Sequence, residues 1–248
     1  MRRIRKSPEP ACLAACRREL QRDERDTGKP PTSKDWDNLG ACSSPVRAAL
    51  VRDQAGLCAY CGRRLVVPPE DPAEQRGRER LEDMKIEHFI ARSVDPRCMF
   101  DWYNLLGVCS GRWEIAGRTI ETCDQARGNE PLNIHPVLHT QDPAELFPVH
   151  HGHVRSADGT SRTGMIEPVG KLATADVRTL NLNCAPLVRN RADVIHRLRT
   201  QLSRDDSPQN IRRLHRSYTL AGPDGLPPHA DVAAAYLARK LRAHGLWP

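Results

Sequence analysis

Residues 57–65 read LCAYCGRRL and place Cys58 and Cys61 in a C-x-x-C spacing, with a glycine directly after the pair. Two thiolates at this spacing on a tight turn can reach one tetrahedral ion, at about 2.3 Å each. The same spacing in a redox pair belongs at the start of a helix that follows a strand. Here residues 44–56 predict a helix before the pair, so a metal knuckle is favoured.

A second pair of cysteines follows, Cys109 in LLGVCSG and Cys123 in ETCDQARG, with thirteen residues between them. That separation is wide for a knuckle. We predict that all four cysteines bind one structural zinc ion (Zn²⁺). The alternative is that Cys109 and Cys123 are small buried residues.

The remaining cysteines carry no clear motif among the nine of the chain. Cys12 and Cys16 lie four apart on a helix predicted over residues 9–24, where core packing is favoured; Cys42, Cys98 and Cys184 are isolated and receive no role. The opening MRRIRKSPEP lacks the apolar run of a signal peptide, and no stretch of about 18 apolar residues exists. We therefore expect a cytoplasmic protein without a membrane span, whose cysteines are metal ligands or buried thiols and not disulfides.

The formal net charge is +7, and arginine far outnumbers lysine. Guanidinium groups bind phosphate in bidentate geometry, so this composition suits a polyanion such as nucleic acid. Two groups of basic residues are candidates for phosphate contacts, although solvated surfaces are the alternative for both. They are an N-terminal arm (Arg2, Arg3, Arg5, Lys6) and a helix predicted over residues 186–203 (Arg189, Arg191, Arg197, Arg199).

Three polar motifs lie between and beside the cysteines: Glu87-His88 in MKIEHFIARS (84–93), Asn104-Leu105 in DWYNLLGVC, and Cys123-Asp124 in CDQAR. Their order resembles the HNH endonucleases, a ββα-metal family. Its usual pattern is C-x-x-C, an acid-His pair, and Asn-Leu with a cysteine five residues after the Asn. A further cysteine follows, with His or Asn directly after it and a lysine three residues further on. The chain departs from it at Glu87 for aspartate, Asp124 for His or Asn, Arg127 for lysine, and in the insertion SGRWEIAGRTIET.

Stretches outside these motifs, such as LNIHP and TLNLNCAPLVRNR, resemble one branch of that family. It contains the PtuB-like nucleases of Septu-type and retron-linked anti-phage systems. The resemblance implies an α+β fold, in which a small zinc-knuckled ββα-metal (HNH) core, residues 46–140, is embedded in helical flanks. Residues 1–45 would form a helical N-terminal extension and residues 141–248 a mostly helical C-terminal region. A charged stretch, residues 68–84, is expected to be a solvated loop, and residues 148–168 short strands around an ADG turn.

The resemblance also implies roles for the polar residues. His88 would be the general base, and Glu87 and Asp124 would hold a catalytic divalent ion, Mg²⁺ or Mn²⁺. Asn104 would fix the loop after the strand and orient His88, and Arg127 would bind the scissile or adjacent phosphate. Neighbours on a strand point to opposite faces. Glu87 and His88 therefore meet at one site only where the strand gives way to a loop.

Other metal ligands are weaker candidates. Asn129 is an alternative third ligand, and the loop histidines are less favoured again: His135, His150, His151 and His153.

The expected function is hydrolysis of DNA phosphodiester bonds by an effector of an anti-phage system. Its partner would be an ABC/SMC-type ATPase encoded alongside, with retron RNA-DNA and a reverse transcriptase as indirect partners. Two alternatives remain open. One is a zinc-stapled adaptor that docks on the ATPase and lacks catalysis, and the other is an RNA-cleaving toxin nuclease.

Overall fold

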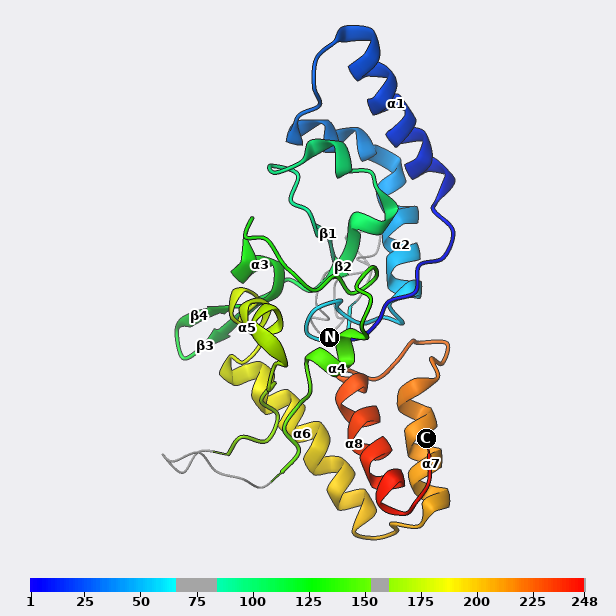
Figure 1. Ribbon diagram of the computed structural model, residues 1–248, viewed down its shortest axis with the longest axis vertical. Coiled ribbons are helices and arrows are strands. Elements are labelled where there is room, and N and C mark those ends of the chain that lie inside the picture. The colour runs from blue at the N-terminus through cyan, green and yellow to red at the C-terminus, as the bar shows by residue number, and fades with distance from the viewer. Residues whose placement is uncertain (66–83, 153–160, 248) are drawn as a thin grey trace.

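A computed structural model describes residues 1–65, 84–152 and 161–247. It confirms a mixed helix-and-sheet fold. Figure 1 shows an elongated molecule with α1 at one end, the strands in the middle and α6, α7 and α8 at the other end. The helices of the described residues are α1 (Ala11–Thr27), η1 (Ser33–Cys42), α2 (Ser43–Asp53), η3 (Pro96–Cys98), η4 (Trp102–Asn104), α3 (Cys123–Arg127), α4 (Pro143–Leu146), α5 (Gly170–Thr179), α6 (Ala185–Leu202), α7 (Pro208–Thr219) and α8 (Ala230–Ala243).

The central sheet pairs β1 (Lys85–His88) with β2 (Leu105–Val108) in antiparallel register, with Glu87 opposite Leu106 and His88 opposite Leu105. All of β2 is buried. Gln54, at the end of α2, is also buried, and its amide nitrogen donates to the carbonyl oxygens of Leu57 and Gly107, each at 2.7 Å. This side chain satisfies backbone groups at the edge of the sheet, so the turn that carries the first cysteine pair is fixed against β2.

A second sheet, β3 (Arg112–Ile115) and β4 (Arg118–Glu121), is a hairpin formed by the insertion between Cys109 and Cys123. Its two-residue turn has positive φ at both positions, 49° at Ala116 and 73° at Gly117. Such turns match the right-handed twist of paired strands. The ribbon extends to one side of the molecule (Figure 1) and leaves both cysteines at its base.

The prediction that Cys12 packs as a core thiol and that Cys42 has no role was wrong, because the two form a disulfide between α1 and the end of η1. The bond closes a loop over a sequence separation of 30 residues. A loop of that size would stabilise the fold by about 3 kcal/mol through the unfolded chain. Cys16 remains a free thiol on α1.

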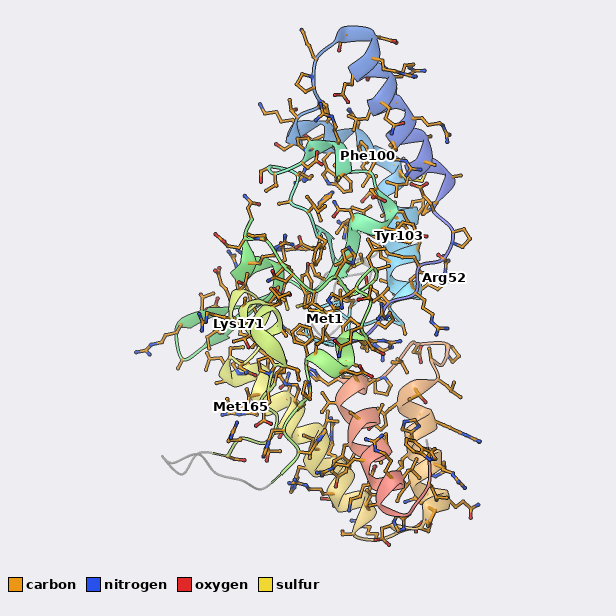
Figure 2. The ribbon with its side chains drawn as sticks, in the orientation of Figure 1. Met1, Arg52, Phe100, Tyr103, Met165 and Lys171 are labelled. Carbon is orange, nitrogen blue, oxygen red and sulfur yellow. A yellow bond between two sulfur atoms is a disulfide. The ribbon has the colours of Figure 1, made fainter. Side chains whose placement is uncertain are left out.

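The N-terminal residues do not form an exposed basic arm. The amino group of Met1 is buried 3.3 Å from a carboxylate oxygen of Asp231, and the amide of Ile4 donates to the carbonyl of Pro136. Lys6 donates to the carbonyl of Leu105 at 2.6 Å, with its ammonium 3.7 Å from the centre of the Trp102 ring. Figure 2 shows Met1 in the middle of the molecule, where this segment joins the two halves.

One hydrophobic core runs from Met1 through the central sheet and α5 to Leu187, and a second lies among α6, α7 and α8. The first core therefore crosses both borders that the sequence placed, at 45/46 and 140/141. Nearly all of the charged stretch 68–84 lies outside the described residues, and so do residues 157–159, where the sequence predicted an ADG turn. Within the predicted strand region 148–168, Val149 and Ile166 form an isolated β-bridge. No helix in the described part of the chain has both the length and the apolar character needed to cross a membrane.

Candidate functional site

The four cysteines of the two pairs converge on one buried point. Cys58 and Cys61 lie on the turn after α2, Cys109 follows β2 directly, and Cys123 is the first residue of α3. Their sulfur atoms lie within 4.8 Å of one another. The cluster joins three segments that are distant in sequence.

The spacing of the sulfur atoms fits a tetrahedral metal ion. The Sγ–Sγ distances are 3.7 Å for Cys61–Cys109, 3.8 Å for Cys109–Cys123 and 4.0 Å for Cys58–Cys123. Four thiolates at about 2.3 Å from a tetrahedral ion would stand about 3.8 Å apart. The cluster could therefore hold a metal such as zinc, and the four cysteines that the sequence singled out are those brought together.

The thiols influence one another's ionisation. Burial works against ionisation of Cys58, but hydrogen bonds from the neighbouring thiols lower the pKa of Cys58 well below its ordinary value. Hydrogen bonds with Cys109 and Cys58 raise the pKa of Cys123 well above its ordinary value. A second buried thiolate next to the first is unfavourable, and a divalent cation would remove that penalty.

A cleft of about 340 Å³ lies beside the cluster and contains three of the predicted catalytic residues, Glu87, His88 and Asp124. Glu87 and His88 are neighbours on β1, yet both line this cleft, because His88 is the last residue of the strand. Asp124 enters from the first turn of α3. The elements occur in the order β1, β2, α3, with the β3–β4 hairpin inserted before α3.

The ring of His88 is held in one orientation. Its Nε2 lies 3.2 Å from the carbonyl oxygen of Met99, and the ring of Trp36 on η1 packs edge-on at 4.4 Å. A carbonyl oxygen only accepts hydrogen bonds, so Nε2 carries the proton and Nδ1 keeps the free lone pair. Burial and the nearby charge of Arg92 lower the pKa of His88 to about 3, so the imidazole is neutral near pH 7.

Glu87 and Asp124 form an acidic pair. Burial and the negative charge of Asp124 raise the pKa of Glu87 to about 8, and the opposing effect of Arg127 does not cancel them. Lys85, two residues before Glu87, has its ammonium 4.0 Å from Asp124. A hard cation between the two carboxylates would relieve their repulsion, and carboxylate oxygens are the ligands that Mg²⁺ and Mn²⁺ prefer.

Arg127 does not reach the cleft as a phosphate ligand, contrary to the sequence prediction. Its side chain is only 1% exposed and forms an ion pair with Glu87. The guanidinium also donates to the carbonyl oxygens of His88 (3.1 Å), Phe89 (2.6 Å) and Glu130 (2.7 Å). Each of the three guanidinium nitrogens donates to a protein oxygen, so Arg127 holds the end of β1 against α3.

Tyr60, inside the C-x-x-C motif, is a partner of the same carboxylate that the sequence analysis missed. Its hydroxyl donates to Oε1 of Glu87 at 3.2 Å, and the side chain is buried. The motif thus supplies both metal-binding thiols and an orienting hydroxyl. The cysteine cluster and the cleft share this element of structure.

Asn104 forms hydrogen bonds to the loop after β1, and its predicted role in orienting His88 stays a prediction. Its amide nitrogen donates to the carbonyls of Ile90 (3.1 Å) and Cys98 (3.0 Å), and its oxygen accepts from the amide of Ile90 at 2.6 Å. Two points of the loop that follows His88, at Ile90 and Cys98, are therefore tied together, and Cys98 directly precedes the Met99 carbonyl that contacts the ring. Each lost bond to a buried partner costs about 1–3 kcal/mol.

The cleft contains a cation that the sequence analysis passed over. Arg92 lines it together with Ser33 and Ser93, and its guanidinium donates to the carbonyl of Ser33 at 3.0 Å. Arg92 is half-buried. Its position in the sequence could have pointed to it, because Arg92 stands four residues after His88 in the stretch MKIEHFIARS.

The weaker ligand candidates are placed differently. Asn129 lines the cleft and is exposed. His135 packs on the ring of Phe89, and Nδ1 of His150 lies 3.2 Å from Glu167. Within the described ranges, no histidine joins a cluster of three or more ligand atoms; His153 lies outside them.

No protein-family model matches the sequence, and no curated protein matches it significantly.

Replacing Cys58 by serine tests the metal cluster. We expect wild-type protein to contain about one zinc per chain, and Cys58→Ser to lose the metal and unfold at lower temperature, because structural zinc contributes folding free energy. The measurement is elemental analysis of the purified proteins beside thermal unfolding. Cys184→Ser, a free and half-buried cysteine outside the cluster, should keep both metal and stability. Wild-type protein without bound metal would contradict the assignment.

Proposed function

We propose that the chain is a metal-dependent endonuclease of the HNH type that hydrolyses DNA phosphodiester bonds. The observation that supports it most is the cleft that joins Glu87, His88 and Asp124 at the end of β1 and the start of α3. A neutral histidine beside two carboxylates is the set of groups that such hydrolysis needs. The motif resemblance supports the assignment to DNA, and RNA is the alternative substrate that the experiment below separates.

In the proposed reaction, Nδ1 of His88 takes a proton from a water molecule that attacks phosphorus. The P–O3′ bond breaks, the leaving 3′ oxygen takes a proton from a solvent water molecule, and the products have 5′-phosphate and 3′-hydroxyl ends. Glu87 and Asp124 would hold Mg²⁺ or Mn²⁺, which supplies stabilisation of the charge on the leaving oxygen. Arg127 and Tyr60 keep the Glu87 carboxylate in place, and Asn104 keeps the His88 loop closed.

The four cysteines would hold zinc with a structural role. All four possible ligand positions are taken by buried thiols, so no position is open for water or substrate. The zinc would fix the start of α3, and with it Asp124, relative to β1.

The biological setting we propose is anti-phage defence with an ABC/SMC-type ATPase as partner. The support is the motif resemblance to the PtuB-like branch. If the partner restrains or delivers the nuclease, cleavage will depend on its presence and on ATP.

Replacing His88 by alanine tests the reaction. We expect wild-type protein to nick or linearise supercoiled plasmid in Mg²⁺ or Mn²⁺, and His88→Ala to be at least 100-fold slower, because a positioned general base contributes about 10²–10⁴ in rate. His196→Ala, at an exposed histidine on α6, is the matched control and should cut normally. Each protein is assayed on DNA and on RNA, with and without the neighbouring ATPase.

If wild type and His88→Ala cleave every substrate at the same rate, with or without added metal, catalysis at this cleft is rejected. That result would favour the alternative of a non-catalytic adaptor that docks on the ATPase. His88-dependent cutting of RNA alone would favour the toxin nuclease.

Arg92→Gln tests which cation contacts the phosphate. A charge-assisted hydrogen bond contributes about 1.5–3 kcal/mol, so kcat/KM should fall roughly 10- to 100-fold. Arg97→Gln is the matched control, because Arg97 lies in the same loop region but pairs with Glu24 at 2.6 Å. If both variants cleave like wild type, Arg92 does not contact the scissile phosphate.

A further inference from the structure

The last three helices lie in one of two strongly basic stretches of the chain. Residues 185–247 contain 11 Lys and Arg against 5 Asp and Glu, a net charge of +6, and residues 1–65 contain 14 against 8, also a net charge of +6. These helices pack around their own hydrophobic core, formed by residues such as Val194, Ile211 and Leu237. The region is thus a basic three-helix unit at one end of the molecule (Figure 1).

The arginines of α6 that the sequence suggested for phosphate binding are only partly free for it. Arg191 is 2% exposed and donates to the carbonyls of Gly164 (2.6 Å) and Leu182 (2.7 Å). Arg199 donates to the carbonyl of His151. Arg189 and Arg197 are exposed.

Helix α7, which the sequence analysis did not identify, carries a stronger basic surface. Arg212, Arg213 and Arg216 are all exposed, and α7 contains no Asp or Glu. Arg212 and Arg216 are one turn apart on the helix, about 6 Å along its axis. Across the described ranges none of the three forms an ion pair with a carboxylate; Arg213 donates to the side chain of Asn210 at 2.8 Å.

The opposite face of α7 is fixed. Ile211 and Leu214 are buried against α8, and α7 and α8 are the most closely packed pair of helices in the structure. The apolar side of α7 is thus occupied by the protein's own core, and the three arginines are exposed together with uncharged polar residues such as Gln209 and Ser217. An amphipathic helix that binds membranes needs its apolar face free, so a lipid surface is disfavoured.

Helix α1 provides an internal comparison. It has four arginines and four acidic residues, so its net charge is zero. Two of its arginines pair with carboxylates, Arg17 with Glu9 at 2.7 Å and Arg22 with Glu19 at 3.7 Å. The acids of α1 therefore balance its arginines, whereas α7 itself contains no acid; Asp205, just before α7, interacts electrostatically with Arg213.

A groove of about 550 Å³ runs beside α7 and extends the basic surface. Its lining includes Arg2, Arg242 and His215. It also includes two acids, Asp142 and Asp231, and the carboxylate of Asp231 is already paired with the amino group of Met1. Asp205 and Asp206 precede α7, and Asp205 accepts a hydrogen bond from the amide of Ser207.

We propose that Arg212, Arg213 and Arg216 of α7, continued by Arg242, form a nucleic-acid-binding surface that contacts the phosphate backbone. A duplex presents about one negative charge per 1.7 Å of its length, so a row of unpaired arginines meets phosphates whatever the sequence. The surface lies apart from the cleft and would anchor the substrate, without taking part in bond cleavage. This inference rests on the proposed function only for the nature of the substrate.

The experiment measures binding in the absence of cleavage. The full-length His88→Ala protein is titrated onto fluorescent duplex DNA, single-stranded DNA and duplex RNA in EDTA, over a series of salt concentrations. The test variant adds Arg212→Gln, Arg213→Gln and Arg216→Gln, and the control variant adds Arg18→Gln, Arg22→Gln and Arg25→Gln on α1. A third variant places lysine at the three α7 positions and keeps the charge.

We expect the α7 glutamine variant to bind at least tenfold more weakly at 100 mM salt. The slope of log K against log salt should become shallower by about 2.7, since each lost phosphate contact contributes about 0.9. The α1 variant should bind within about twofold of the parent, and the lysine variant should keep the parent's slope. All substituted positions are exposed, so thermal unfolding should be unchanged and serves as the folding control.

Binding by the α7 glutamine variant that equals the parent's would overturn the proposal, and so would a parent that binds no nucleic acid. Binding to anionic phosphatidylserine vesicles in place of nucleic acid would assign the surface to lipid instead. If the α7 arginines prove unnecessary for binding but cleavage still depends on His88, only the proposal for α7 is rejected. If binding depends on the α7 arginines but no substrate is cleaved, only the nuclease proposal is rejected.

Discussion

The structure depends most on the convergence of four buried thiols. The four cysteines come from three separate segments, with Cys58 and Cys61 on one turn and Cys109 and Cys123 each on another, and their sulfur atoms lie within 4.8 Å of one another. The two sheets around them have only two strands each, which are marginally stable by themselves. Thiols packed so closely cannot all ionise without a cation. A tetrahedral metal would both permit their ionisation and lock the ends of β2 and α3 together, so that the cleft beside them keeps its shape.

The second constraint is a buried charge network. Arg127 donates to the Glu87 carboxyl group with almost no exposure to solvent, and removing one partner of such a buried hydrogen-bonded pair costs about 1–3 kcal/mol. The guanidinium also donates to the backbone carbonyls of His88 and Phe89, and these hydrogen bonds fix the end of β1. This places His88 at the last strand position and lets it share a cleft with its neighbour. In this account Arg127 shapes the site, and Arg92 is the cation left to meet substrate.

The sequence predicted the residues of the cysteine cluster, because ligand type and spacing are local signals. It also predicted the helices that became α1, α2 and α6. It missed α7, although Ser207-Pro208 followed by Ile211 and Leu214 is a capped amphipathic pattern, and it missed the β3–β4 hairpin. The roles of Arg127 and Lys6 could not be read from sequence, because burial depends on tertiary packing. The Cys12–Cys42 bond was missed because nothing local shows that η1 folds back onto α1.

We propose that two different metal sites lie side by side, one formed by the four cysteine thiols and one by the carboxylates of Glu87 and Asp124. The direct measurement is anomalous X-ray diffraction from crystals of His88→Ala protein soaked in Mn²⁺, recorded at the zinc and manganese absorption edges. We expect a zinc peak among the four cysteine sulfur atoms and a separate manganese peak in the cleft between Glu87 and Asp124. Manganese absent from that cleft at saturating concentration, with zinc in place, would contradict the claim that these carboxylates form a catalytic ion site.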